Sequence, residues 1–297
     1  MLIAHISDFH VVPEPQLCYG YSNTRLSLLR TINRLNHMLP RPDIVIITGD
    51  LVDEPSPEAY ETLGGILQKL VLPFLVIPGN HDDRVQLAAL FPDNTCLTGS
   101  NAAANFIQTM GEGQDATRLI AFDAVVSGKE YAEITLQGLQ WLESALEQTS
   151  PFPTMIAMHH PPVLTGLAFM DAFQPPLSSE LTNLLIAAPH VKLIMCGHVH
   201  RQIDGMLGHA RIASAGSTAH QFALATDVDS VPRLSGEPPL IRLHLWRKET
   251  VTSFTVPVDD NFAVHSFEGI DAASWKRIRE SLRAGEQRQV GATIEEQ

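Results

Sequence analysis

Five short segments of the chain combine acidic, amide and histidine side chains in a pattern typical of catalytic metal sites. They are Asp8-Phe9-His10, Gly49-Asp50-Leu51-Val52-Asp53, Gly79-Asn80-His81-Asp82, His159-His160 and Gly197-His198-Val199-His200. Each segment directly follows a short apolar run. Oxygen and imidazole donors without a thiolate suit Mn, Fe, Co or Zn at a reactive centre better than a closed structural zinc site. The sequence therefore predicts a reactive metal centre.

The candidate donors are sufficient for two metal ions that share one carboxylate. They divide into one group for each ion and one bridging side chain: Asp8, His10 and His200; Asn80, His159 and His198; and Asp50. Each ion would then have four protein ligands and room for water. Because a neutral amide binds a cation less tightly than a carboxylate does, we expect the ion at Asn80 to be the more weakly held.

Such a pair of ions indicates phosphoester chemistry. Two cations about 3.5–4 Å apart can share a hydroxide, lower its pKa towards neutrality and hold both sides of an in-line displacement at phosphorus. His81 can donate to the phosphoryl group or protonate the departing alkoxide. The alternative is that His81 only holds a turn. We predict catalytic roles for Asp50, Asn80 and His81, with Asn80 and His81 also contacting the substrate.

Short apolar runs bounded by Pro, Gly or Asp predict buried strands. They cover residues 2–6, 44–48, 74–77, 118–122, 155–158 and 191–196. Amphipathic helices are expected between them, one capped by Thr24, one beginning after Ser56, and others around residues 139–146 and 181–185. Strands that alternate with helices indicate an α/β layered fold. The carboxyl ends of such strands meet in one crevice, so the metal-binding segments should converge there.

The pattern changes beyond Arg211. Residues 211–215, 240–245 and 250–256 predict strands without intervening helices, which favours a more antiparallel region. The proline-containing residues 227–239 predict a loop, and residues 272–283 predict a short helix. We divide the chain into a metal-binding domain at 1–220 and a strand-rich extension with a tail at 221–297.

In this order, the five segments resemble the calcineurin-like metallophosphoesterase superfamily. Its pattern is D-x-H, G-D-x-x-D, G-N-H-[DE], a later His, and G-H-x-H, and every ligand position is filled here. The resemblance covers about residues 1–220. It implies a four-layer α/β/β/α sandwich with a binuclear site at its edge. It also implies that the C-terminal extension is a cap used in dimer contacts, so we expect a homodimer or a higher homo-oligomer.

Within the superfamily, the chain is similar to the class III cyclic-nucleotide phosphodiesterase branch, and especially to bacterial glycerophosphodiester phosphodiesterases. The similarity lies in residues 1–8, 17–21, 77–83 and 158–162. It also places His220 near the metals, either behind the ligands or facing the substrate. His220 is therefore a further candidate for catalysis and substrate binding.

Four other side chains have two open interpretations each. Tyr19 and Tyr21 either form the floor of the substrate pocket or only pack against their neighbours. Asp53 and Asp82 either orient the ligand histidines or cap the helices that follow them.

Composition limits the partners. The formal net charge of −13 argues against a surface for long nucleic acids, which would need clustered Lys and Arg. It is compatible with a phosphate substrate, because bound cations reverse the local sign. We also expect no membrane-spanning segment and a cytoplasmic location. The three cysteines form no CxxC pair, and Cys196 is predicted to be a buried structural thiol.

The predicted function is therefore metal-dependent hydrolysis of small phosphodiesters, such as glycerophosphodiesters or 3',5'-cyclic nucleotides, by a metal-bridging hydroxide. A phosphomonoesterase or protein phosphatase is the alternative enzyme. It would need strong anion contacts for a terminal dianion, and the arginines near the motifs are Arg84 and Arg201. A non-catalytic scaffold is disfavoured, because Asp50, Asn80 and His81 are all present.

Overall fold

The computed structural model describes residues 1–92, 102–126, 128–173, 178–248, 250–263, 265, 267 and 269–283. Contacts divide the chain into two compact units, Met1–Asp259 and Asp260–Gln297. The first contains the two sheets and the metal-binding segments. The second contains α7 (Ala272–Arg283), a helix with the bounds predicted from the sequence.

The first sheet has the strand order β13-β12-β1-β2-β3. Its strands are β1 (Leu2–Ile6), β2 (Ile44–Ile47), β3 (Phe74–Val76), β12 (Leu240–Arg247) and β13 (Thr250–Pro257). β1, β2 and β3 run parallel, whereas β12 is antiparallel to β1 and to β13. The compact unit continues to Asp259, and the pairing of β12 with β1 joins this late segment to the first sheet. The proposed boundary at residue 220 stays a prediction.

The second sheet has the order β4-β5-β6-β7-β9-β8. Its strands are β4 (Phe106–Met110), β5 (Thr117–Ala121), β6 (Thr154–Ala157), β7 (Val191–Cys196), β8 (Asp204–Leu207) and β9 (Ala210–Ser214). β5, β6, β7 and β9 run parallel, and the edge strands β4 and β8 are antiparallel to their neighbours.

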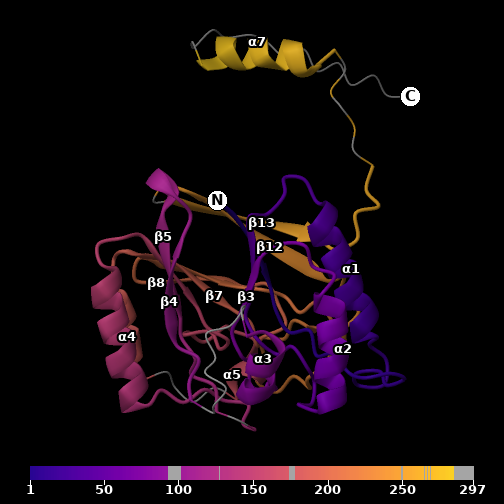
Figure 1. Cartoon of the computed structure of the whole chain (residues 1–297), viewed down its shortest axis with the longest axis vertical. Coiled ribbons are helices and arrows are strands. Elements are labelled where there is room, and N and C mark those ends of the chain that lie inside the picture. Colours follow the sequence, from indigo (N-terminus) through magenta and orange to yellow (C-terminus); the bar gives the residue numbers. More distant parts are fainter. Residues whose placement is uncertain are drawn as a thin grey trace. The chain divides into compact units, whose positions relative to one another are not determined.

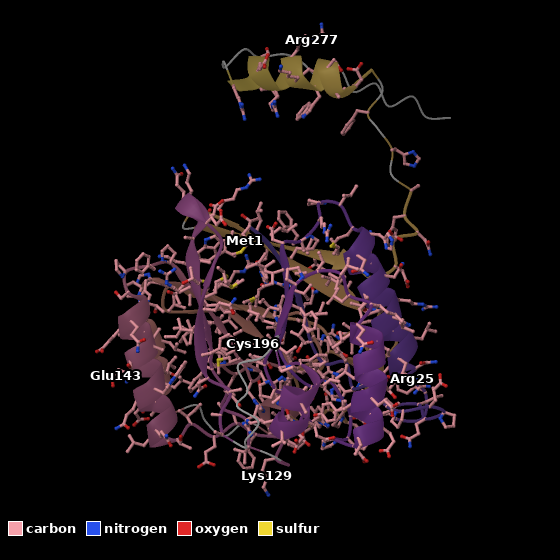
Figure 2. All side chains as sticks on the ribbon, viewed as in Figure 1. Met1, Arg25, Lys129, Glu143, Cys196 and Arg277 are labelled. Atoms are coloured by element: carbon pink, nitrogen blue, oxygen red, sulfur yellow. The ribbon has the colours of Figure 1, made fainter. Side chains whose placement is uncertain are left out.

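The two sheets pack face to face through a shared apolar core. Its buried side chains come from both sheets and include Ile3, Ile46, Leu119, Met155, Leu193 and Trp246. Full burial of a large apolar side chain contributes about 1.5–3 kcal/mol to folding. Cys196 at the end of β7 lies among the interior side chains, whereas Glu143 and Lys129 are exposed (Figure 2). The prediction of a buried Cys196 is confirmed.

Helices cover the outer face of each sheet. α1 (Thr24–His37), α2 (Pro57–Leu67) and α3 (Arg84–Leu90) share a core with the first sheet, and α4 (Leu136–Thr149) and α6 (Ser179–Ile186) share one with the second. In Figure 1, α1 and α2 lie on one side of the strands and α4 on the opposite side. The layers are α/β/β/α, and the predicted fold class is confirmed.

Polar residues begin the helices as helix capping requires. Ser56 accepts a hydrogen bond from the amide of Ala59, as expected from Ser56-Pro57. Asn23 caps α1 by accepting from the amide of Leu26, so the prediction that Thr24 is the cap was wrong. The Thr24 hydroxyl instead accepts a hydrogen bond from the amide of Val12.

Three short elements lie outside the two main sheets. They are the 3-10 helix η1 (Gly113–Asp115), the helix α5 (Ala168–Asp171) and the ribbon of β10 (Gln221–Phe222) with β11 (Leu234–Ser235). The prediction that residues 227–239 form a loop is therefore wrong for β11, which pairs antiparallel with β10. None of the described helices is both long and apolar enough to cross a membrane.

Candidate metal centre

The structure brings the five predicted segments together at the carboxyl ends of β1, β2, β3, β6 and β7. The amide of Asp8 donates to the carbonyl of Gly49 at 3.0 Å, and the amide of Phe9 donates to that of Asp50 at 2.7 Å. The amide of His198 donates to the carboxylate of Asp8 at 3.0 Å. These bonds tie the loops after β1, β2 and β7 to one another.

Most of these ligand candidates have a left-handed backbone. The φ angles are 55° at Asp8, 44° at His10, 54° at Asp50, 70° at His198 and 50° at His200. Asp and His adopt this conformation more readily than most residues do, and strain of about 1–3 kcal/mol per residue is typical where function requires it. The turns aim successive side chains into one space instead of alternating them across a strand.

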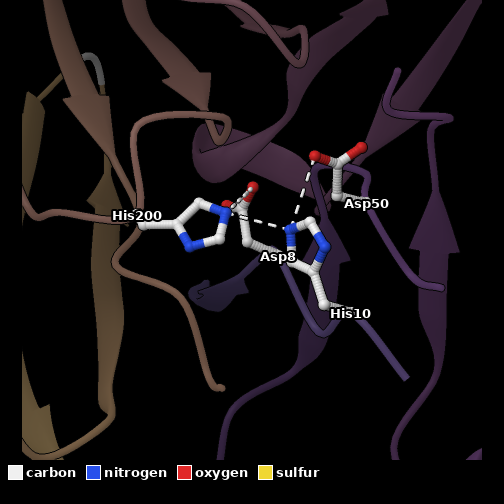
Figure 3. Close-up of side chains that lie close together, drawn as sticks. All are labelled: Asp8, His10, Asp50 and His200. Carbon is white, nitrogen blue, oxygen red and sulfur yellow. Dashed lines mark hydrogen bonds and ion pairs between the residues drawn. The ribbon is translucent and has the colours of Figure 1, made fainter. Parts of the chain in front are cut away.

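The first cluster contains Asp8, His10, Asp50 and His200, whose candidate ligand atoms all lie within 4.8 Å of one another (Figure 3). His10 Nε2 lies 2.9 Å from His200 Nε2 and 3.6 Å from Asp50 Oδ2. His200 Nε2 lies 3.6 Å from Asp8 Oδ1. All four side chains are buried.

The second cluster contains Asp50, His159 and His198 within the same limit of 4.8 Å. His159 Nε2 lies 3.2 Å from Asp50 Oδ2. The amide oxygen of Asn80 adds a fourth donor, 3.0 Å from His159 Nε2 and 3.1 Å from His198 Nδ1. Asp50 therefore belongs to both clusters, which is the arrangement that a bridging carboxylate requires.

The hydrogen bonds around the first cluster show that its donors fit a cation. His10 Nδ1 donates to Asp53 at 3.1 Å, and His200 Nδ1 donates to the carbonyl of His220 at 3.1 Å. In the neutral rings both Nε2 atoms then carry lone pairs, and these face each other at 2.9 Å. The buried Asp8 Oδ2 has no hydrogen-bond partner among the described residues. A metal ion would satisfy all three atoms.

The protonation states of Asp8, His198 and His200 agree with this fit, whereas His159 would have to release a proton to bind an ion. Burial lowers the pKa of His198 and of His200 well below the usual value, so both rings are neutral donors at pH 7. Burial raises the pKa of Asp8 to about 6, because a carboxylate out of contact with water is disfavoured. A cation beside it would compensate for this loss. Although burial opposes it, the attraction between His159 and Asp50 holds the pKa of Asp50 well below its usual range and raises that of His159 to about 9.

Glycine is required where the loops approach the ligands. A Cβ atom at Gly79 would lie 2.1 Å from Asp50 Oδ1, and one at Gly197 would lie 2.1 Å from Ser7 Oγ and 2.9 Å from Asp8 Oδ2. Any side chain at either position would displace a candidate ligand.

The clusters open into a cavity of about 400 Å³ that has two different walls. We define the metal wall by His10, Asp50, Asn80, His198 and His200. We define the aromatic wall by Phe169, Met170, Phe173, Phe222 and Leu234, which come from α5, the residues after it and the β10–β11 ribbon. Tyr19, His81, Glu130, Pro232 and Arg233 complete the lining.

The sequence matches the Calcineurin-like phosphoesterase family over residues 1–202. The chain belongs to this family. It is 32% identical over 246 residues to "Glycerophosphodiester phosphodiesterase GpdQ" of Enterobacter lignolyticus, covering 82% of this chain and 86% of that protein. It is 31% identical over 221 residues to "3',5'-cyclic-nucleotide phosphodiesterase alr5338" of a Nostoc species, covering 74% of this chain and 79% of that protein.

A solved structure supports the same fold. The crystal structure of a dimetal phosphatase from Danio rerio matches with a TM-score of 0.55 and 12% identity, over 87% of this chain and 99% of that one. At this identity the likeness shows the fold alone.

In this phosphoesterase, His81 lies beside the candidate bridging carboxylate. Its amide donates to Asp50 Oδ1 at 3.0 Å, and its Nδ1 donates to the carbonyl of Asp53 at 2.7 Å. Although burial opposes it, the Asp50 carboxylate raises the pKa of His81 above the usual value. The raised pKa shifts His81 towards the imidazolium form that the predicted role as a donor requires, and with Nδ1 bound to the carbonyl of Asp53, Nε2 is the ring atom left for the substrate. The alternative that His81 only holds a turn is also compatible with these two hydrogen bonds.

Glu130 was missed by the sequence analysis. It lines the cavity, and its Oε2 accepts a hydrogen bond from the amide nitrogen of Asn80 at 3.1 Å and lies 3.9 Å from His81 Nε2. This contact fixes the orientation of the Asn80 amide, so that its oxygen faces the second cluster. Glu130 lies in a loop beyond β5 without a recognisable motif, and the sequence carries no signal for its position.

The other predicted site residues take different places. Tyr19 lines the cavity, and its ring lies 5.1 Å from that of His220. His220 is buried behind the first cluster, with its ring 4.8 Å from that of His200. Burial lowers the pKa of His220 to about 3, so the ring is neutral. Neither His220 nor the half-exposed Tyr21 is among the described residues that line the cavity.

The two aspartates left open by the sequence also differ. Asp53 orients a candidate ligand, since it accepts from His10 Nδ1. Asp82 accepts hydrogen bonds from the amides of Leu51 and Gly79, so it fixes the loops after β2 and β3. The residue that caps α3 is Asp83. For Asp82, both interpretations from the sequence were wrong, because its carboxylate points inward to backbone amides.

Proposed function

We propose that this calcineurin-like phosphoesterase hydrolyses small phosphodiesters, namely glycerophosphodiesters or 3',5'-cyclic nucleotides, with two metal ions bridged by Asp50. The observation that carries the proposal is that the Asp50 carboxylate belongs to both candidate clusters. Relatives named for each of these two activities support the substrate class.

The donor set supports Mn, Fe, Co or Zn as the ions. Asp8, His10 and His200 would hold one of them, and Asn80, His159 and His198 the other. When bound, two such ions lower the pKa of a shared water and polarise the phosphoryl group. Asn80 contributes a neutral amide, so the ion on its side is expected to be the more weakly bound.

The residues of the chain supply orientation and proton transfer. The Asp53 carboxylate holds the His10 ring, and the carbonyl of Asp53 holds the His81 ring. With Nδ1 fixed in this way, His81 Nε2–H is directed away from the backbone and towards the phosphoryl group or the departing alkoxide. Such general-acid or electrostatic help contributes about 10²–10³-fold to rates of this kind.

The charges around the cavity favour a diester over a monoester. The Arg84 guanidinium donates two hydrogen bonds to the Asp123 carboxylate, at 2.7 and 2.8 Å. The Arg201 guanidinium donates to the carbonyl of Phe222 and to the Glu237 carboxylate. Neither guanidinium is among the described residues of the lining. Arg233 does line the cavity, next to Leu234 of the aromatic wall, whereas the Glu130 carboxylate contacts Asn80 and lies 3.9 Å from His81. The dianion of a monoester would face this carboxylate close to His81. A diester carries one charge less, so its repulsion is weaker.

The assembly is a further proposal that rests on the family resemblance. We propose a homodimer or a higher homo-oligomer in the cytoplasm. Light scattering on the purified chain measures the mass in solution, and a monomer at all concentrations would contradict the proposed oligomer.

The diester proposal is tested with a pair of chromogenic substrates. After metal removal and reloading with Mn²⁺, we expect a larger kcat/KM for bis(p-nitrophenyl) phosphate than for p-nitrophenyl phosphate. The Asp50→Asn variant, assayed in parallel, controls for contaminating hydrolases. A preference for the monoester would contradict the proposal.

A further inference from the structure

The aromatic wall adjoins the metal wall, since Phe222 of the one contacts His200 of the other. The rings of Phe169 and Phe173 lie 5.1 Å apart in an edge-to-face arrangement, and those of Phe169 and Phe222 lie 5.3 Å apart in the same way. Phe173 is 40% exposed. Three linked rings, one of them exposed, give this part of the lining a continuous aromatic surface.

This wall is fixed to the metal centre. The ring of Phe222 lies 4.6 Å from that of His200, tilted by 30°. Arg201, the residue after this ligand, donates to the carbonyl of Phe222 and pairs with Glu237 at 2.8 Å. The amide of Ala168 donates to the carbonyl of Ala225 at 3.1 Å, which joins α5 to the segment after β10. The aromatic wall therefore stands at a set position beside the first cluster.

The wall offers little to a hydroxylated or amino alcohol. Its five residues carry no polar side chain. The two acidic side chains in the lining, Asp50 and Glu130, are on the metal side, where Glu130 contacts Asn80. A glycerol or ethanolamine group placed against the phenylalanines would lose its hydrogen bonds to water and gain no polar partner in return. A flat heteroaromatic ring would instead stack on them, which strengthens binding by about tenfold or more for each base.

We propose that the aromatic wall is a nucleobase subsite and that this chain prefers 3',5'-cyclic nucleotides to glycerophosphodiesters. The inference rests on the proposed function and narrows its substrate class. The cavity of about 400 Å³ lies within the range of about 300–1,000 Å³ that is typical for drug-sized ligands. The phosphodiester would lie at the metal wall, and the base would lie against the surface formed by the rings of Phe169, Phe173 and Phe222. The guanidinium of Arg233, which also lines the cavity, is available to contact the base from the ribbon side.

The first test compares two substrates on the Mn²⁺-loaded wild-type chain. We expect kcat/KM for 3',5'-cyclic AMP to exceed that for glycerophosphoethanolamine by at least about tenfold. Equal values, or a preference for glycerophosphoethanolamine, would overturn the nucleobase subsite and leave the diesterase proposal intact. If neither diester were hydrolysed while p-nitrophenyl phosphate was, both proposals would fail.

The second test assigns the preference to the wall. Phe173→Leu removes an exposed ring, so the variant should fold, and we expect the ratio of the two kcat/KM values to fall about tenfold. Phe173→Tyr keeps a ring and should keep the ratio. Phe254→Leu is the matched control, because Phe254 is a similarly exposed phenylalanine, at 48%, on β13 outside the described cavity lining. An unchanged ratio in Phe173→Leu would overturn the assignment.

Discussion

The two walls of the cavity are built in opposite ways. The metal wall consists of buried polar side chains on turns that directly follow sheet strands, and several of its residues have positive φ angles. The aromatic wall consists of buried and partly exposed apolar side chains on the short α5 and the two-residue strands of the β10–β11 ribbon. The sheets therefore position the candidate metal ligands, whereas short elements outside the sheets would contact the part of the substrate that lies beside the phosphodiester.

This contrast predicts that substitutions in the metal wall abolish turnover, whereas those in the aromatic wall change the choice of substrate. The largest effect is expected for Asp50→Asn, which keeps the shape of the side chain and removes the shared charge. We expect kcat to fall by at least about 10³-fold together with loss of one bound ion. Mn²⁺ content and steady-state kinetics measure both.

The matched control for this substitution is Asp259→Asn, at an exposed aspartate beyond β13. It should retain both activity and metal content. An Asp50→Asn protein that kept both ions and full activity would show that Asp50 does not bridge.

A smaller loss is expected for His81, which lines the cavity beside His10 of the metal wall. His81→Gln removes the proposed cationic donor, and we expect kcat to fall by about 10²–10³-fold with both ions retained. His37→Gln, at the exposed end of α1, is the control. If metal loss accounted for the whole effect of His81→Gln, His81 would have a structural role only.

The support of the metal wall can be tested at Asp53. Asp53→Asn weakens the acceptor that orients His10 Nδ1. Since such contacts behind a ligand contribute about 10–100-fold to metal affinity, we expect the first ion to bind that much more weakly. Calorimetric titration with Mn²⁺ measures this, and an unchanged affinity would contradict the orienting role of Asp53.

Buried histidines behind the metal wall should make stability depend on pH. His5 contacts Thr48 Oγ1 and His244, and His244 contacts Ser253. Burial lowers the pKa of His5 well below 6.5 and that of His244 to about 3. The unfolded chain then binds protons that the folded chain does not. The contribution of each histidine to the free energy of unfolding is fully present above pH 6.5. Below that pH it decreases by about 1.4 kcal/mol per pH unit for each histidine.

The His244→Phe variant isolates one of these contributions. Between pH 6 and pH 5, the free energy of unfolding of the metal-free variant should decrease less steeply than that of the metal-free wild type, by about 1.4 kcal/mol per pH unit. Urea denaturation at each pH provides the measurement. Parallel slopes for the two proteins would mean that His244 does not resist protonation.

The smallest effect is expected at an exposed residue of the cavity lining, Tyr19. Tyr19 is 59% exposed and lines the cavity. Tyr19→Leu removes an aromatic contact with bound substrate, so KM should rise by about two- to tenfold with kcat unchanged. A large fall in kcat would place Tyr19 in the chemistry and weaken the contrast between the walls.

The candidate ligands could be brought together from the sequence because each of them lies within a few residues of a strand end. Asp8 follows β1 and Asn80 follows β3 closely, so a correct strand assignment also placed the candidate ligand. The same logic gave the layers of the fold. It missed β4 and β8, which are edge strands with polar residues or glycine among the apolar ones.

The rest of the cavity depends on contacts between distant segments. The place of Phe222 depends on the short pairing of β10 with β11. Arg84, which is outside the described lining, holds Asp123 in the loop after β5 from 39 residues away. Glu130 reaches Asn80 across 50 residues. The periodicity of the sequence predicts which face of a helix or strand is buried. It does not predict these contacts, because they depend on the conformation of loops.

The most direct measurement of the central claim is a crystal structure of the Mn²⁺-loaded chain with anomalous scattering data. The account predicts two peaks about 3.5–4 Å apart, with an oxygen of Asp50 in contact with both. His10 and His200 should lie at one peak, and His159 and His198 at the other. A single peak, or an Asp50 carboxylate bound to one ion only, would contradict it.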